Sequence, residues 1–151
     1  MYTRFTYLFT LAILTAIAGC GTNNVPFGGT VTFSDDGTPL EVGTVAFTNG
    51  VQQARGDLGP GGKFDLGFVK VSDGLPKGTY TVYITGAVKQ EERVAANARP
   101  GEKFWTETRL IAPKYNSPDT SGLTVTVDGT TRTFDIKVDR ATGKDALPQD
   151  R

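Results

Sequence analysis

Histidine is absent from this chain of 151 residues, and cysteine occurs once. Without histidine, Ser-His-Asp and Cys-His catalysis are excluded, and the commonest zinc ligand is missing. A single cysteine cannot form an internal disulfide, so a domain of this length has to be held by its own core. Hydrolases built on paired carboxylates are a class that these absences leave open.

An excess of charge of either sign is also lacking. Lysine plus arginine number 16, and aspartate plus glutamate number 16. Nucleic-acid binding calls for a basic patch, and binding to anionic lipid calls for a polybasic stretch. The sequence contains neither, so we expect no nucleic-acid partner.

The longest mainly apolar run lies at the N-terminus. Arg4 supplies a short positive region, residues 7–17 are predominantly apolar, and small residues then lead to Cys20. This layout predicts a secretory signal peptide. The run is shorter than the roughly 20 residues that a membrane-spanning helix needs. An ordinary cleaved signal peptide with an incidental cysteine is the alternative.

The end of this segment, Ile17-Ala18-Gly19-Cys20, resembles the lipobox of bacterial lipoproteins. The resemblance implies removal of residues 1–19, acylation of the Cys20 thiol with groups such as palmitate, and a short tether over residues 20–26. Two or more lipid chains anchor a protein stably to a bilayer. Gly21 stands where an aspartate would retain such a lipoprotein in the inner membrane, so we expect the outer membrane, facing the periplasm.

After the tether, short runs with one apolar face alternate with turns rich in glycine and proline. The clear runs are residues 30–33, 44–48, 63–66, 79–85, 123–127 and 133–138, with weaker ones at 51–57 and 107–111. Such alternation is typical of half-buried antiparallel strands. Seven or eight of them without a strong helix predict an all-β antiparallel β-sandwich over residues 27–139. The polar residues 140–151 are expected to form a flexible tail.

Two local features add detail to this prediction. Asp128-Gly129 separates the last two clear runs and predicts a hairpin between them. Residues 86–118 form a long mixed segment, in which residues 91–98 are expected to make a short helical turn that Pro100 and Gly101 end.

Five stretches occur in an informative order: 29–32 (GTVT), 36–40 (DGTPL), 43–47 (GTVAF), 61–64 (GGKF) and 76–82 (PKGTYTV). Together they resemble the carboxypeptidase regulatory-like, or transthyretin-like, domain over about residues 27–138. Residues 113–123 look like a segment common in small bacterial lipoproteins that carry this domain. The resemblance implies a seven-stranded β-sandwich of prealbumin-like topology. In metallocarboxypeptidases this domain is an accessory to a separate catalytic domain.

Enzymatic relatives of that fold use histidines, which this chain lacks, so we expect neither enzymatic activity nor a cofactor. The acidic residues Asp35, Asp36 and Asp57 lack the spacing of calcium loops and are expected to serve turns, with no metal bound. The glycine-rich residues 59–63 lack a phosphate-binding pattern and predict a turn. The glutamates of the long segment are expected to be solvated surface: Glu91, Glu92, Glu102 and Glu107.

Three aromatic residues, Phe104, Trp105 and Tyr115, lie in or near the long mixed segment. Aromatic side chains on a sandwich loop can stack on sugar rings or other apolar ligand faces. The alternative is that they plug the open end of the sandwich.

The sequence therefore predicts a non-catalytic, lipid-anchored β-sandwich that acts as a structural or interaction module in the cell envelope. Its partners would be the membrane, through the lipid, and an envelope protein. A carbohydrate-binding module that holds a polysaccharide through the loop aromatics is the alternative.

Overall fold

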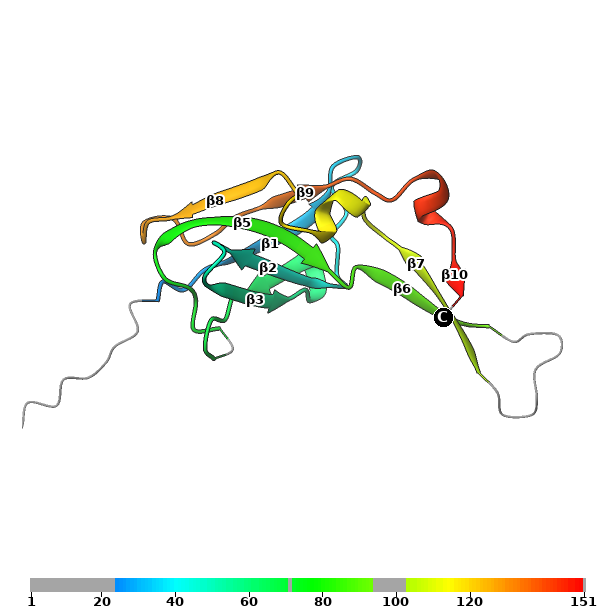
Figure 1. Cartoon of the computed structure of the whole chain (residues 1–151), viewed down its shortest axis with the longest axis horizontal. Coiled ribbons are helices and arrows are strands. Elements are labelled where there is room, and N and C mark those ends of the chain that lie inside the picture. Colours follow the sequence, from blue (N-terminus) through cyan, green and yellow to red (C-terminus); the bar gives the residue numbers. More distant parts are fainter. Residues whose placement is uncertain (1–23, 71, 94–102, 151) are drawn as a thin grey trace, which may run out of the picture.

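Alternating strands and turns build an all-β structure, as the sequence predicts (Figure 1). The computed structural model describes residues 24–70, 72–93 and 103–150. Within them the only helical elements are three short 3-10 turns: η1 (Pro60–Gly62), η2 (Pro113–Asn116) and η3 (Gly143–Ala146). The signal segment and Cys20 lie outside the described residues.

Seven strands form the two layers of a β-sandwich. One sheet has the order β4-β1-β9, and the other has the order β3-β2-β5-β8. The strand bounds are β1 (Gly28–Phe33), β2 (Thr44–Thr48), β3 (Gln53–Asp57), β4 (Lys63–Asp65), β5 (Gly78–Thr85), β8 (Leu123–Val127) and β9 (Ile136–Val138). All neighbours are antiparallel except β1 and β9, which run parallel with Val31 opposite Ile136.

The hydrophobic core lies between the two sheets. Along β5, Tyr80, Val82 and Ile84 are buried, because alternate side chains of a strand point to the same face. Phe47 of β2 packs edge-on against Phe27, with ring centroids 5.8 Å apart. Burial of one such side chain stabilises the fold by about 1.5–3 kcal/mol. The alternation of apolar and polar residues along the strands therefore supplies the side chains that are buried between the two sheets.

The hairpin predicted at Asp128-Gly129 is wrong. Strand β8 pairs with β5 in one sheet, while β9 pairs with β1 in the other. The Asp128 carboxylate accepts hydrogen bonds from the backbone N–H groups of Thr130 (2.8 Å) and Thr131 (3.2 Å), and Gly129 has a φ of 94°. This turn directs the chain from one sheet to the other. The Asp-Gly pair therefore begins a connection between the two sheets, where the sequence predicts a hairpin within one sheet.

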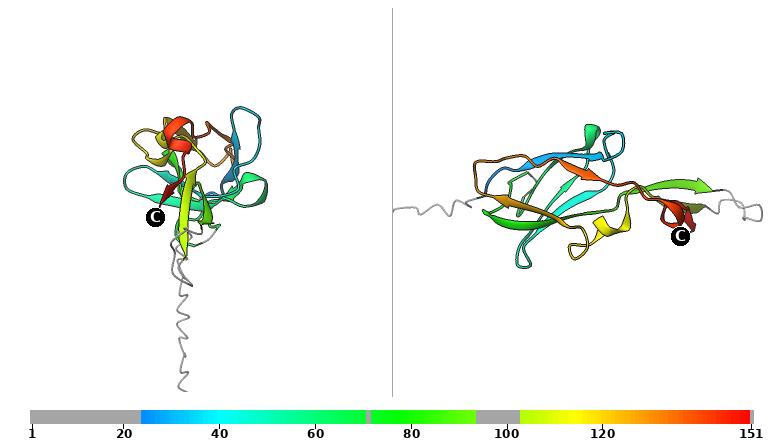
Figure 2. Two further views of the ribbon diagram at one scale, coloured as in Figure 1. Left: turned by 90° about the vertical axis from the view of Figure 1, so that its right-hand side faces the viewer. Right: turned by 90° about the horizontal axis from the view of Figure 1, so that it is seen from above.

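A second, smaller sheet extends from the sandwich and is called the arm below. It consists of β6 (Val88–Arg93), β7 (Phe104–Arg109) and β10 (Gln149–Asp150), in the order β10-β7-β6. Strand β6 follows β5 after a short connection, and the arm continues along the long axis of the molecule (Figures 1 and 2). The segment that precedes β1, drawn in blue, enters at the opposite end of the sandwich (Figure 1).

The predicted helical turn over residues 91–98 is wrong for its described part. Glu91, Glu92 and Arg93 belong to β6 and lie opposite Thr106, Trp105 and Phe104 of β7. Pairing with β7 satisfies backbone groups that a short isolated helix would leave open. Residues 94–98 lie outside the described residues.

Defined secondary structure also extends into residues 140–150, for which the composition predicts a flexible tail. Turn η3 is followed by β10, in which Gln149 lies opposite Glu107 and Asp150 lies opposite Thr106. The end of the chain thus supplies the third strand of the arm.

Strands β3 and β4 approach each other closely at one side of the sandwich, and this yields a stability test. A Cβ atom on Gly56 would lie 2.4 Å from the carbonyl oxygen of Asp65. We expect Gly56→Ala to lower the free energy of unfolding by about 1–3 kcal/mol, because backbone has to move. Chemical denaturation measures this.

The matched control is Gly59→Ala, whose Cβ would lie 3.8 Å from its nearest neighbour, the Lys63 carbonyl oxygen. Equal unfolding free energies for the two variants would contradict the close approach.

Candidate functional site

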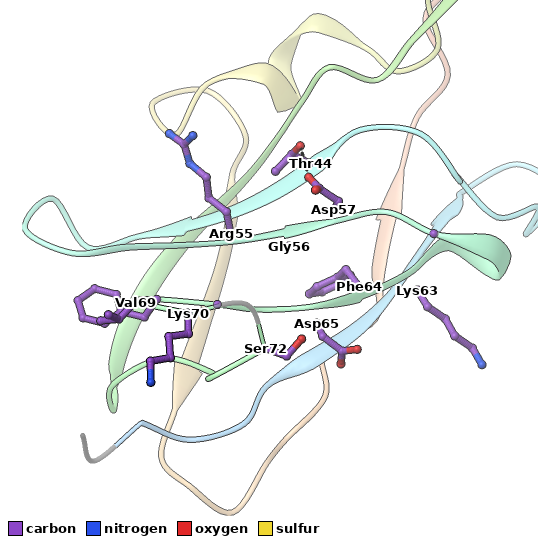
Figure 3. Close-up of a pocket in the computed structure, with 13 residues that line it drawn as sticks. Thr44, Arg55, Gly56, Asp57, Lys63, Phe64, Asp65, Val69, Lys70 and Ser72 are labelled. Carbon is purple, nitrogen blue, oxygen red and sulfur yellow. Dashed lines mark hydrogen bonds between the residues drawn. The ribbon is translucent and has the colours of Figure 1, made fainter. Parts of the chain in front are cut away.

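A groove of about 570 Å³ lies between the edges of β3 and β4 (Figure 3). Its charged side chains do not converge: Arg55, Lys63 and Lys70 point in different directions. The Arg55 guanidinium donates to the Gln53 amide oxygen, and the Asp57 carboxylate accepts from the Thr44 hydroxyl at 2.7 Å. Ligand sites combine an apolar pocket with polar groups aimed at one point. This groove lacks that arrangement.

In the part of the chain that the structure describes, no three His, Cys, Asp or Glu side chains are grouped to hold a metal ion. Asp35 and Asp36, the acidic pair after β1, instead bind Arg140. The Arg140 Nε lies 2.8 Å from an Asp35 carboxylate oxygen, and its Nη2 lies 2.8 Å from one of Asp36. The guanidinium also covers the Phe33 ring, 3.6 Å from its centroid.

Asp36 serves the turn as well, as its position predicts. Its carboxylate accepts hydrogen bonds from the Thr38 hydroxyl (2.7 Å) and the Thr38 backbone N–H (2.9 Å). These bonds, with a smaller contribution from Arg140, lower the pKa of Asp36 to about 2.

Asp139, next to Arg140, joins three further groups. Its carboxylate accepts hydrogen bonds from the Ser34 hydroxyl (2.6 Å), the Lys114 ammonium (2.7 Å) and the Tyr115 hydroxyl (3.1 Å). The Lys114 contact is the largest cause, followed by Ser34 and Tyr115, of a pKa of Asp139 lowered to about 2. We call Asp139, Arg140 and these side-chain partners the clasp: Ser34, Asp35, Asp36, Thr38, Lys114 and Tyr115.

The clasp lies where the arm leaves the sandwich. The Ala112 N–H donates to the Asp139 carbonyl at 2.9 Å, and the Ala141 N–H donates to the Leu110 carbonyl at 3.1 Å. Residues that follow β7 are therefore fixed to residues that follow β9. The acidic pair and the lysine of η2 are therefore engaged in structural ion pairs next to the base of the arm.

The structure separates the three aromatic candidates. Tyr115 in η2 is buried, packs with the core and donates its hydroxyl hydrogen to Asp139. Phe104 and Trp105 stand on β7 of the arm and are 37% and 44% exposed. As neighbours in a strand they point to opposite faces, so the three do not form one binding platform.

Trp105 shares its face of the arm with polar cross-strand pairs. It lies opposite Glu92, whose carboxylate is 3.2 Å from the Lys103 ammonium. Further along the arm, the Gln90 amide donates to the Glu107 carboxylate at 2.8 Å. The predicted surface glutamates therefore include three in the arm, while Glu102 lies outside the described residues.

Strand β6 and the arm that it builds are the features that sequence reasoning missed, although the weak run predicted at residues 107–111 overlaps β7 (Phe104–Arg109). Five of the six residues of β6 are exposed, and the strand has no apolar face. Alternation of polarity therefore gave no signal for it. A weak signal was the run of threonine and aromatic residues in β7, which fits a strand surface.

In comparisons with known proteins, the chain has no significant match to a family model, a curated protein or a solved structure. Among the described residues no helix is long and apolar enough to cross a membrane.

The clasp predicts how acid affects the fold. The pKa of Asp139 in the folded protein, about 2, lies below its ordinary value of 3.8. Its carboxylate therefore contributes stability that is present above about pH 4 and is lost as the pH falls towards 2. We expect Asp139→Asn to lower the urea midpoint near neutral pH and to reduce the drop in midpoint towards pH 2.

Urea titrations at several pH values measure both effects. Asp119→Asn, at an exposed position after η2, is the control and should follow the wild type. The role of the clasp would be refuted by an Asp139→Asn curve that parallels the wild type at every pH.

Proposed function

We propose that this chain is a non-catalytic, lipid-anchored module of the bacterial cell envelope that presents the arm to a partner. The observation that carries this proposal is the position of the arm, at the end of the molecule opposite the segment that precedes β1 (Figure 1). A sheet that leaves the sandwich costs ordering free energy without adding to the core. Contact between the arm and another molecule would explain why the chain orders this sheet.

The N-terminal end supports the anchored orientation. Val25 is fixed to Leu75 by two backbone hydrogen bonds, 2.8 and 3.1 Å long, so the tether enters the sandwich at a defined place. Five residues of extended chain from Cys20 to Val25 reach at most roughly 18 Å. A lipid on Cys20 would therefore keep this end close to the bilayer, with the arm on the far side.

The polar groups of the described residues support a non-catalytic role. The carboxylates of Asp36 and Asp139 are engaged in the clasp. The charged side chains of the groove point in different directions: Arg55, Lys63 and Lys70. The two-sheet sandwich agrees with the resemblance to carboxypeptidase regulatory-like domains, in which the domain is an accessory. One fold hosts many functions, so the proposed role is inferred from these sites and from the sequence of residues 17–20.

Replacement of Cys20 tests the anchor. We expect Cys20→Ala to abolish metabolic labelling with an alkyne analogue of palmitate and to release the protein from the membrane fraction. Its thiol is the only one in the chain, so no other cysteine can substitute. Thr22→Ala is the control and should keep both label and location.

Density-gradient separation of inner and outer membranes then locates the labelled wild type, which we expect in the outer membrane. Unchanged membrane association of Cys20→Ala would refute lipid anchoring.

Polysaccharide binding by the arm is the second candidate, and the 44% exposure of Trp105 favours it. Tryptophan emission reports on this position alone because the chain has one tryptophan. We expect red-shifted emission from the free protein. Binding of a cell-wall or plant polysaccharide through this ring would shift the emission to the blue and saturate.

Phe104→Ala, on the opposite face, is the matched variant and should bind as the wild type does. Emission that ignores every polysaccharide in the panel would exclude Trp105 as a sugar platform and favour a protein partner.

A further inference from the structure

Among the residues that the structure describes, the outer edge of β6 is open. In the ranges 24–70, 72–93 and 103–150, β6 pairs with β7 and with no other strand. Five of its six residues are exposed, and the arm stands clear of the sandwich (Figure 2). A strand edge with unpaired N–H and C=O groups is a template for another strand.

The backbone groups at this edge can be assigned from the pairing with β7. The Leu110 N–H donates to the Ala87 carbonyl at 3.0 Å, one step before Val88 and Arg109 lie opposite each other. Bonded and non-bonded residues alternate along an antiparallel pair. Ala87 and the odd-numbered residues of β6 therefore face β7, and the even-numbered residues face outwards.

Three residues consequently present backbone groups to the open edge: Val88, Gln90 and Glu92. The Val88 N–H already donates to the Gly86 carbonyl at 2.8 Å. Two donors, from Gln90 and Glu92, and three carbonyl acceptors remain directed outwards. An antiparallel strand that offers the same pattern in reverse order fits this edge, and β6 of a second copy is such a strand.

The charges of β6 select one register for that pairing. With Gln90 opposite its own counterpart, Lys89 lies opposite Glu91 of the second copy, and Glu91 lies opposite its Lys89. Both side chains belong to one face, as their contact of 2.6 Å within one chain shows. The adjacent symmetric registers centre on Lys89 or on Glu91, and each places like charges opposite each other.

We propose that the arm is a self-association surface, in which β6 pairs antiparallel with β6 of a second copy about a twofold axis at Gln90. Four backbone hydrogen bonds form across the axis, two donated by Gln90 and two by Glu92. The two arms overlap and the sandwiches lie on opposite sides of them. The contact is small, so the dimer dissociates on dilution.

This inference goes beyond the proposed function and needs only the arm, so it fails or holds independently of the lipid. The full-length chain is purified in detergent with micelles in excess over protein. One preparation carries Lys89→Cys, a second carries Glu91→Cys, and a third mixes the two. After mild oxidation, we expect a disulfide-linked dimer mainly in the mixture, because these positions lie opposite each other only between copies.

The wild-type chain, whose one cysteine is Cys20, corrects for cross-linking at that residue. Absence of the dimer from the mixture, or equal yields in all three preparations, would overturn the proposed register.

A charge exchange tests the same contact without cysteines. Lys89→Glu places glutamates opposite each other, and sedimentation should show roughly tenfold weaker self-association. The double variant Lys89→Glu/Glu91→Lys restores opposite charges and should restore the dimer. Equal association of all three chains would overturn the proposal.

Proline distinguishes the edge from the folded hairpin. Gln90→Pro removes an outward N–H that β7 does not use, and it should abolish the dimer while the arm remains. Gln90→Ala keeps that N–H, loses the side-chain bond to Glu107 as the proline variant does, and should still associate. A Gln90→Pro chain that dimerises as the wild type does would contradict strand pairing.

Discussion

Two adjacent residues at the end of β9, Asp139 and Arg140, connect the separate parts of the molecule. Arg140 holds the acidic loop after β1, and Asp139 holds Ser34 of that loop together with Lys114 and Tyr115 of η2. The chain on either side of η2 leads from the arm back to β8. This pair of charges therefore attaches η2 and the loop after β1 to the chain that leads into the base of the arm. An exposed ion pair contributes little by itself, and the clasp gains from being a network in which each carboxylate has several donors.

The arm shows why such a network is needed. A two-stranded hairpin in water is marginally stable. The two aromatic side chains of the arm, Phe104 and Trp105, are exposed and do not belong to the described core. Strand β10 adds a third strand, and the residues after β7 and β9 are bonded to each other at the base. Order in the arm thus comes from backbone pairing and from the clasp, while order in the sandwich comes from burial of apolar surface. Polar residues in the arm leave it free to contact other molecules.

Local sequence predicted those parts of the fold in which burial decides the structure. The runs at residues 44–48 and 79–85 have a complete apolar face, and both are strands close to the expected bounds. Strand β6 has no such face, so its conformation depends on β7, which lies after the undescribed residues 94–102. Asp128-Gly129 marks a turn without specifying which sheet the chain enters next. Likewise, the path of the backbone decides that Tyr115 is buried and Trp105 is exposed. The spacing of the aromatic residues in the sequence does not predict this difference. The chemistry of Cys20 remains a prediction from residues 17–20.

The parallel pairing of β1 with β9 has a consequence for how the chain folds. The Thr30 hydroxyl donates to the Asp135 carboxylate across a sequence separation of 105 residues. The first sandwich strand is therefore unable to acquire its central place in the sheet until the segment of β9 has been synthesised. Contacts of such long range form slowly, because a large loop has to close first. If residues 1–19 direct the chain to an export channel, as we propose, this delay is useful, because β9 (Ile136–Val138) is synthesised late and the polypeptide can still be threaded until then.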